Sequence, residues 1–267
     1  MINVWNTTPI GYNKEFDNVH NIGMPQMEEF AIKDGKKHSC FLIFPGGGYD
    51  HMSDHEGANV ARELNKYGIS AFVFYYRVAP YAHPTYIYDA KRAMRYVRYN
   101  ADKYNIYSDK IGVMGFSAGG HLASVLAEHY DHYEYDAIDD IDSVSAMPNA
   151  LGMCYPVVSI TNDEISHKRS GDNISGGDEK VRKALSSELS VRRDMPPIFI
   201  WHTFEDKSVD CRNSLEMAKS LKEKNCSFEL HIFPEGKHGL DLAKNVDGTN
   251  QWFELYINWL KRIGFII

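Results

Sequence analysis

The sequence lacks the features that mark membrane-spanning, secreted and nucleic-acid-binding proteins. It contains no run of about 18 apolar residues, which is the length that a membrane span requires. Its first residues, MINVWNTTPIGYNKEF, hold no basic region followed by an apolar stretch, so we do not expect a secretory signal. The formal net charge of -7 at pH 7 provides no basic footprint. Neither a membrane nor nucleic acid is therefore an expected partner.

Cysteine is also scarce. The four cysteines are scattered and none has CxxC spacing: Cys40, Cys154, Cys211 and Cys226. This pattern is atypical of a disulfide framework or a structural zinc site. We interpret the four as reduced thiols and expect a cytoplasmic protein.

Six short apolar runs predict strands that are buried on both faces. They are CFLIFP (40–45), ISAFVFYYR (69–77), IGVMG (111–115), ALGMCYPVV (150–158), PIFIWHT (197–203) and FELHIFP (228–234). The runs are continuous rather than alternating, which is typical of a parallel sheet covered by helices. Within residues 1–37, pieces such as MEEFAIK predict antiparallel edge strands.

Helical patterns separate these runs, so strands and helices alternate as they do in βαβ units. Apolar residues recur at helical spacing in three places: Ala90, Ala93, Met94 and Val97; Leu215, Ala218 and Leu221; and Trp252, Phe253, Tyr256, Ile257 and Leu260. Asp210 precedes the second pattern, and we expect it to be the N-cap of that helix. The pattern predicts an α/β protein.

The length favours one α/β domain that spans residues 1–267. We find no internal repeat and no low-complexity linker. Two polar stretches, 131–146 and 161–180, have few core positions. They are too short to form a separate domain, and we expect them to be insertions over the sheet.

The segment GFSAG (115–119) matches the pattern GxSxG, with an apolar run before it and helical spacing after it. A sharp strand-to-helix turn forces the serine into an unfavourable backbone conformation, which requires small neighbours. Such a turn lifts the hydroxyl of Ser117 above the sheet and places the first amides of the helix beside it. The alternative is a tight turn with an idle serine.

Three successive glycines follow the first long apolar run, in FPGGGYDHMSDHEG. Because such a run costs conformational entropy, close approach of the backbone to a ligand is a reason to retain it. The amides of Gly47, Gly48 and Ala118 are expected to form an oxyanion hole. The alternatives are a flexible loop and a phosphate cradle, but the run lacks both GK[ST] and GxGxxG spacing.

A reactive serine needs a base, and the base needs an orienting carboxylate. In α/β-hydrolases these follow the serine in the order acid, then histidine, each in a loop after a strand. Asp206 and His238 occupy such loops. Glu205 and Asp210 compete with Asp206, although Asp210 is better explained as a helix cap. The other histidines considered are expected to be core or supporting groups: His121, His202 and His231.

Taken together, these segments resemble the α/β-hydrolase serine esterases. The resemblance is to the small bacterial acetyl esterases and the acetylxylan/feruloyl esterase-like group, related to the hormone-sensitive-lipase-like branch. It runs from about residue 38 to the end of the chain. It rests on PGGGY, HEGANVARELNKYGISAFVFYYRVAP, YIYDAKRA, GFSAGGHLA, PPIFIWHTFEDKSV and PEGKHGL.

The resemblance implies an α/β-hydrolase fold with a mostly parallel central sheet, helices on both faces and no large separate cap. It implies Ser117 as nucleophile, His238 as base and Asp206 as orienting acid, with oxyanion amides from Gly47, Gly48 and Ala118. No cofactor or metal is expected. Two positions depart from the family pattern: Pro45 replaces a common histidine, and Asp210 replaces a common proline.

The expected reaction is hydrolysis of short acyl esters through an acyl-enzyme. The resemblance to this subgroup favours an acetylated sugar as the small-molecule substrate. A polar, aromatic pocket that would suit it is expected from Tyr49, His51, His55, Tyr81 and Tyr155. The alternatives are a peptidase of the same fold and a non-catalytic ligand-binding protein. Exposed aromatic residues between positions 75 and 107 are compatible with a homo-oligomer, although ordinary packing explains them equally well.

Two further segments have alternative interpretations as metal sites. His51, Asp54, His55 and Glu56 lie close together in the sequence, but their spacing matches no standard ligand pattern. Residues 136–142, DAIDDID, are acidic but lack the glycine and the terminal glutamate of an EF-hand loop. A mixed polar active-site loop and a solvated acidic turn are the favoured interpretations.

Overall fold

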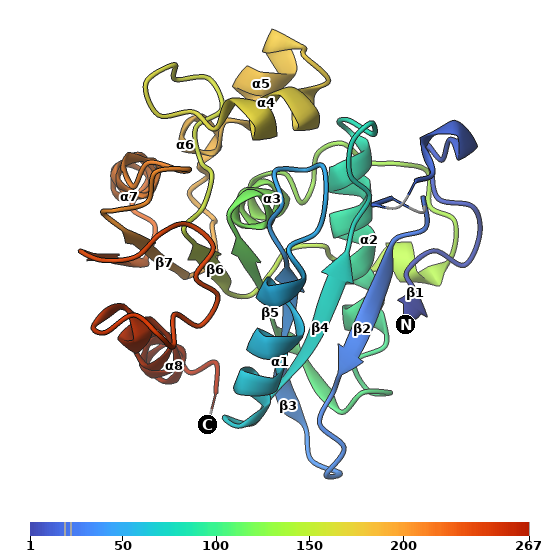
Figure 1. The fold of residues 1–267 in the computed structure, drawn as a ribbon. Coiled ribbons are helices and arrows are strands. Elements are labelled where there is room, and N and C mark those ends of the chain that lie inside the picture. Colours follow the sequence, from blue (N-terminus) through green and yellow to red (C-terminus); the bar gives the residue numbers. More distant parts are fainter. Residues whose placement is uncertain (19, 22, 267) are drawn as a thin grey trace.

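The computed structural model describes residues 1–18, 20–21 and 23–266. Within these residues the chain forms an eight-stranded sheet in the order β1-β2-β4-β3-β5-β6-β7-β8 (Figure 1). The strands are β1 (Ile2–Asn3), β2 (Gln26–Phe30), β3 (His38–Phe44), β4 (Ile69–Tyr75), β5 (Ile106–Phe116), β6 (Leu151–Cys154), β7 (Ile198–Thr203) and β8 (Phe228–Phe233).

The pairing of the strands confirms the predicted sheet. The six strands from β3 to β8 are parallel to one another, whereas β1 and β2 add to the β4 side in antiparallel orientation. Each of the six predicted apolar runs overlaps one of the parallel strands. Since parallel strands end at the same edge, the loops after β3, β5, β7 and β8 meet there.

Helices cover both faces of the sheet, as predicted (Figure 1). One core cluster joins the sheet to α2 (Thr85–Tyr99), α3 (Ala118–Glu128) and α7 (Arg212–Glu223). The other joins the opposite face to α1 (Ala58–Asn65) and α8 (Trp252–Arg262). The remaining helices are short: α4 (Lys168–Ser175), α5 (Glu179–Leu185) and α6 (Ser187–Ser190), with 3-10 helices η1 (Lys14–Phe16), η2 (Asp54–Glu56), η3 (Asp140–Ser143) and η4 (Thr249–Gln251).

The predicted buried face of α7 is wrong in one position. Leu215 is 46% exposed, whereas Met217 and Leu221 are buried. Residues 215 and 221 lie about 120° apart around a helix axis, so a face centred on Leu221 and Met217 turns Leu215 to solvent. Asp210 lies one residue before the actual N-cap, and its carboxylate accepts a hydrogen bond from the amide of Arg212 at 2.8 Å.

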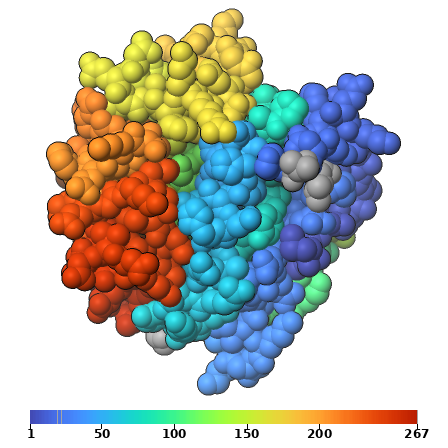
Figure 2. Space-filling view, viewed as in Figure 1, coloured from blue at the N-terminus to red at the C-terminus, as the bar shows by residue number. Residues whose placement is uncertain are grey.

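The two polar stretches lie in different places. Residues 131–146 carry η3 and pack beside α2, where Asp139 pairs with the buried Arg92 at 2.6 Å. Residues 161–180 carry α4 and part of α5, which stand beyond the carboxyl ends of the strands at the top of Figure 1. In Figure 2 their yellow surface borders the light-blue surface of the chain near residue 50. In the described part of the chain, every helix is too short or too polar to cross a bilayer.

Candidate active site

Ser117 occupies the sharp turn between β5 and α3. Its φ angle is 53°, in the left-handed region that L-residues rarely adopt. The turn depends on glycine neighbours, because a Cβ on Gly115 would lie 2.1 Å from the carbonyl oxygen of Gly119. A Cβ on Gly119 would lie 2.1 Å from the carbonyl oxygen of Phe44. The steric requirement inferred from GFSAG is therefore present in the structure.

The structure brings the three residues of the predicted triad together. His238 Nε2 lies 2.8 Å from Ser117 Oγ, and His238 Nδ1 lies 2.6 Å from Asp206 Oδ2. Because Nδ1 donates its proton to the carboxylate, Nε2 is left as the acceptor for the serine hydroxyl. The geometry fits a base that takes a proton from Ser117.

Asp206 is held as an anion by its surroundings. Burial opposes its ionisation, but hydrogen bonds from His202 and His238 outweigh that effect and hold the pKa of Asp206 below its ordinary value. Its other oxygen, Oδ1, accepts the amides of Ser208 and Val209 at 2.9 and 3.0 Å. The carboxylate is thus fixed on both sides.

The competing acids and histidines have other partners. Glu205 accepts the amide of Gly236, so it braces the loop that carries His238. His202 is buried between Ser214 Oγ and the carbonyl of Val209, with Nε2 3.3 Å from Asp206. His231 pairs with Glu229 on β8.

The glycine run lies beside Ser117 and adopts a backbone that requires glycine. Gly47 has φ of 122° and Gly48 has φ of 64°, and a Cβ on Gly47 would lie 2.0 Å from the carbonyl oxygen of His51. In residues 1–18, 20–21 and 23–266, no hydrogen bond uses the amides of Gly47, Gly48 or Ala118. All three amides are available to an oxyanion.

Glu56 ties the glycine run to the opposite side of the site. It is 2% exposed and accepts the amide of Gly46 at 2.8 Å. It also accepts the hydroxyl of Tyr155 at 2.7 Å, and that hydroxyl accepts the amide of Asp241 at 3.0 Å. The ring of Tyr155 meets His238 edge-on at 5.1 Å. Glu56 therefore connects the glycine run to the loop of His238.

Sequence reasoning did not assign this role to Glu56. It appeared only as a member of a metal-site alternative with His51, Asp54 and His55. In the described ranges 1–18, 20–21 and 23–266, no group of three or more His, Cys, Asp or Glu side chains is placed to share a metal ion. Its partner Tyr155, and Asp241 beyond it, are far away in the sequence. No local sequence pattern predicts these contacts.

The helix α4 braces the glycine run from the other side. Asn173 Nδ2 donates to the carbonyl of Gly48 at 2.8 Å, and Arg169 pairs with Asp50. His121 adds an internal link, since it accepts the hydroxyl of Tyr49 and donates to the carbonyl of Leu185, each at 2.8 Å. This agrees with a supporting role for His121. The wall made by α4 was missed, because residues 161–180 had been interpreted as a polar insertion.

An open pocket of about 520 Å³ lies over Ser117 and His238. Among the five residues expected to line a substrate pocket, His51 and His55 do so. The prediction is wrong for three tyrosines, which are buried and do not line this pocket: Tyr49, Tyr81 and Tyr155. Their hydroxyls bond to His121, Asn13 and Glu56 respectively, because burial of a phenol requires a polar partner. Basic side chains from α4 and the His238 loop form the rim instead: Arg169 and Lys237.

Comparison with known proteins identifies the family. A match to the BD-FAE family covers residues 30–221. The chain belongs to the BD-FAE family. It is 34% identical over 250 residues to endo-1,4-beta-xylanase B of Butyrivibrio fibrisolvens and 31% identical over 253 residues to the acetylxylan esterase of Xylanibacter ruminicola. These matches cover 91% and 92% of the chain, but the chain spans 38% and 50% of the two relatives.

Solved structures of similar proteins support the same fold. The acetyl ester-xyloside bifunctional hydrolase of Caldicellulosiruptor lactoaceticus has 42% identity and a TM-score of 0.92, and the match covers 100% of this chain and 97% of that one. Esterase 2 of Thermogutta terrifontis has 26% identity and a TM-score of 0.75, with 91% and 89% covered. The α/β-hydrolase fold and the resemblance to acetyl and feruloyl esterases are thus confirmed.

Proposed function

We propose that the chain hydrolyses short acyl esters, and acetyl esters of carbohydrates in particular, through an acyl-enzyme on Ser117. The observation that carries this proposal is the continuous hydrogen-bond chain from Ser117 through His238 to Asp206 at the floor of an open pocket. The free amides of Gly47, Gly48 and Ala118 lie beside it. Nucleophile, base, orienting acid and oxyanion donors are the parts that acyl transfer needs.

In the proposed reaction, His238 takes the proton of Ser117 as Oγ attacks the ester carbonyl. The oxyanion that forms on the carbonyl oxygen accepts hydrogen bonds from Gly47, Gly48 and Ala118. His238 then gives the proton to the leaving alcohol, which departs and leaves the acyl group on Ser117. Water, deprotonated by His238, attacks this acyl-enzyme and releases the acid and the free serine. The chain supplies every group in this sequence.

The proposed acetylated carbohydrate rests on the relatives and on the polar pocket. One relative is named as an acetylxylan esterase and another as an acetyl ester-xyloside hydrolase. Structures of the Thermogutta esterase hold propionate and butyrate, which are short acyl products, and another shows that enzyme phosphorylated by paraoxon. A pocket rimmed by His51, His55, Arg169 and Lys237 suits hydroxyl-rich alcohols better than long acyl chains.

The test is a panel of acyl groups and leaving alcohols. Nitrophenyl acetate, butyrate and a long-chain ester measure the acyl preference, acetylated xylo-oligosaccharides measure the alcohol preference, and a nitrophenyl xyloside tests glycoside cleavage. We expect acetyl esters to be hydrolysed best, with a loss of at least a thousandfold in Ser117→Ala. Ser208 also lines the pocket, so Ser208→Ala is the matched control and is expected to stay active.

Either of two results contradicts the proposal. Retention of ester hydrolysis within about tenfold in Ser117→Ala removes the nucleophile assignment, because loss of a triad serine costs far more. A clear preference for long-chain acyl groups removes the acetyl ester assignment and leaves a general esterase.

A further inference from the structure

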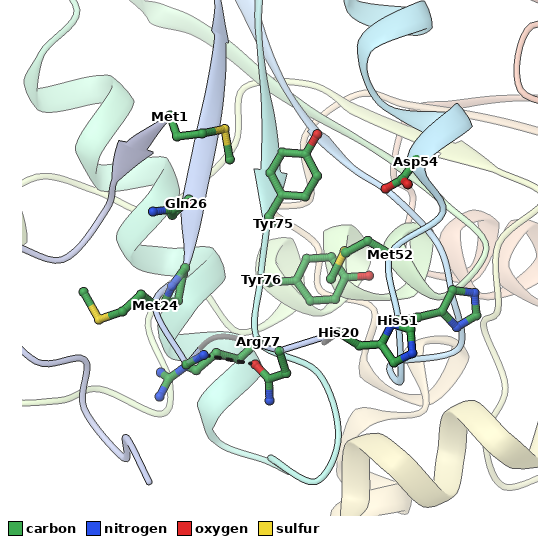
Figure 3. A pocket seen from close by; sticks show the side chains of 13 residues that line it. Met1, His20, Met24, Gln26, His51, Met52, Asp54, Tyr75, Tyr76 and Arg77 are labelled. Atoms are coloured by element: carbon green, nitrogen blue, oxygen red, sulfur yellow. Dashed lines mark hydrogen bonds between the residues drawn. The ribbon is translucent and has the colours of Figure 1, made fainter. Parts of the chain in front are cut away.

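A second hollow lies beside the catalytic pocket, at the carboxyl end of β4 (Figure 3). We call it the side hollow and define it by Gln26, His51, Met52, Asp54 and Tyr75. Its volume is about 430 Å³, within the range of roughly 300–1,000 Å³ found for ligand sites. The proposed acyl-transfer reaction uses none of Gln26, Met52, Asp54 and Tyr75.

The side hollow and the catalytic pocket share one wall, His51, which lines both. The backbone of His51 is fixed to the glycine run, because its amide donates to the carbonyl of Gly47 at 3.3 Å. Its ring Nδ1 lies 2.6 Å from Asp50 Oδ1. A ligand whose carbonyl lies at Gly47 therefore passes His51 when it extends into the side hollow.

The side chains of this hollow combine an aromatic face with polar groups. Tyr75 is half-buried, and its hydroxyl is anchored to Glu28 Oε2 at 3.2 Å. Burial, together with Glu28 and Asp54, raises the pKa of Tyr75 to about 12, so the ring stays neutral. In Figure 3 the exposed carboxylate of Asp54 lies across the hollow from this ring, and Met52 lies below them beside the ring of Tyr76.

This combination matches the two kinds of surface on a sugar ring. The carbon-bound hydrogens form an apolar face that packs against aromatic rings and thioethers. The hydroxyls at the edge donate to carboxylates and exchange hydrogen bonds with amides and imidazoles. Asp54 and Gln26 offer such acceptors at opposite ends of the side hollow (Figure 3). A carboxylate in this place disfavours an anionic ligand.

We propose that the side hollow is a saccharide subsite that binds a neutral sugar ring of the substrate's alcohol portion, with Tyr75 as its stacking surface. The assignment rests on the proposed function, because it places the ester of the same molecule at Ser117. His51 then contacts the substrate between the two sites. Binding here raises the efficiency toward longer acetylated oligosaccharides and leaves small esters unaffected.

The experiment compares two substrates in the same variants. Acetylated xylotriose reaches both hollows, whereas nitrophenyl acetate needs only the catalytic pocket. In Tyr75→Ala, we expect kcat/KM for acetylated xylotriose to fall roughly three- to tenfold, the range for one lost aromatic contact. We expect the value for nitrophenyl acetate to stay within about twofold. Tyr75→Phe keeps the ring and is expected to behave like the wild type, as is Tyr99→Ala at an exposed tyrosine at the end of α2.

A direct binding measurement separates this inference from the proposed function. Xylotriose without acetyl groups is titrated into Ser117→Ala and into Ser117→Ala/Tyr75→Ala, and we expect the double variant to bind more weakly by a similar factor. If the wild type does not hydrolyse acetylated xylotriose but the double variant still binds xylotriose more weakly, the substrate assignment fails and the subsite stands. If acetylated xylotriose is hydrolysed equally well with and without Tyr75, the subsite is wrong and the esterase function stands.

Two more results are decisive. If Tyr75→Ala does not fold, Asp54→Ala takes its place, because Asp54 is exposed and its removal leaves the core intact. An unchanged kcat/KM for acetylated xylotriose in that variant then overturns the proposal. A loss confined to long-chain nitrophenyl esters also overturns it, since the side hollow would then hold acyl chains.

Discussion

The two ends of α3 differ in how they affect a nearby negative charge. At the N-terminal end, the amide of Ala118 directly follows Ser117 and has no hydrogen-bond partner among residues 1–18, 20–21 and 23–266. At the C-terminal end, Glu128 is 1% exposed and accepts the hydroxyl of Ser124 at 2.6 Å. A helix stabilises negative charge at its N-terminus and disfavours it at its C-terminus.

Burial at the second end raises the pKa of Glu128 to about 8. The carboxyl is therefore mainly neutral at pH 7. In the proposed mechanism, the same helix stabilises a transient anion at one end and carries a neutral acid at the other. Under the proposed mechanism, the first end stabilises a charge that appears only during the reaction, whereas the second carries an acid that burial keeps neutral.

Three effects are expected to follow. The largest concerns the triad beside the N-terminal end of α3 and is expected from Asp206→Asn. The variant keeps the shape but removes the charge that orients His238 and stabilises its protonated form. We expect kcat for nitrophenyl acetate to fall a hundredfold or more. Glu205→Gln is the matched control, because Glu205 is the neighbouring carboxylate and a glutamine can still accept the amide of Gly236. Equal activity in the two variants would contradict the assignment of Asp206.

A smaller effect is expected from Glu56→Gln, which acts on the oxyanion loop rather than on the reacting atoms. Glutamine has one acceptor oxygen for the two donors, Gly46 and Tyr155, that the carboxylate now accepts. We expect kcat to fall about tenfold with little change in KM, since loss of a whole oxyanion donor costs roughly 100- to 1000-fold.

The control for Glu56→Gln is Glu63→Gln on α1, whose carboxylate pairs with Lys66 instead. It is expected to match the wild type. A rise in KM with constant kcat in Glu56→Gln would show that Glu56 contributes to substrate binding and would remove its positioning role.

The smallest effect is expected at the C-terminal end of α3 and concerns the stability of the fold. Glu128 keeps its proton in the folded chain up to about pH 8, whereas the unfolded chain loses it near the ordinary pKa of about 4.3. The unfolded state is therefore increasingly favoured between these two values, and stability falls as the pH rises through this range. Glu128→Gln removes this pH-dependent loss of stability. We therefore expect its Tm to exceed that of the wild type by several degrees at pH 8, and the difference in Tm to be smaller at pH 5.

Thermal unfolding at pH 5, 6.5 and 8 measures this difference. Glu223→Gln is the matched control, because Glu223 ends α7 as Glu128 ends α3 but is exposed. An equal pH dependence in wild type and Glu128→Gln would mean that Glu128 is already ionised in the folded chain.

The parts of the site that were predictable are those encoded locally. Ser117 is recognised by glycines two positions before and after it, because the turn itself needs them. Asp206 and His238 are recognised by their position after apolar runs, since parallel strands deliver such residues to one edge. Each of these inferences uses only a few neighbouring residues and the order of the elements.

The parts that were missed depend on contacts between distant residues. Glu56 meets Tyr155, and Asn173 meets Gly48, across loops whose paths cannot be read from periodicity. Tyr49, Tyr81 and Tyr155 were expected to line a polar, aromatic pocket. Each instead forms a hydrogen bond with a residue of another segment, which makes burial of its large ring favourable.

The link between Asn173 and Gly48 has a consequence for how the protein loses activity on heating. The loop that carries Gly47 and Gly48 is braced by α4, which lies outside the sheet and contacts this loop through Asn173 and Arg169. Segments of this kind open at lower free energies than the core. Catalysis should therefore fade at temperatures where the sheet and its two layers of helices are still intact, and recover on cooling as α4 returns.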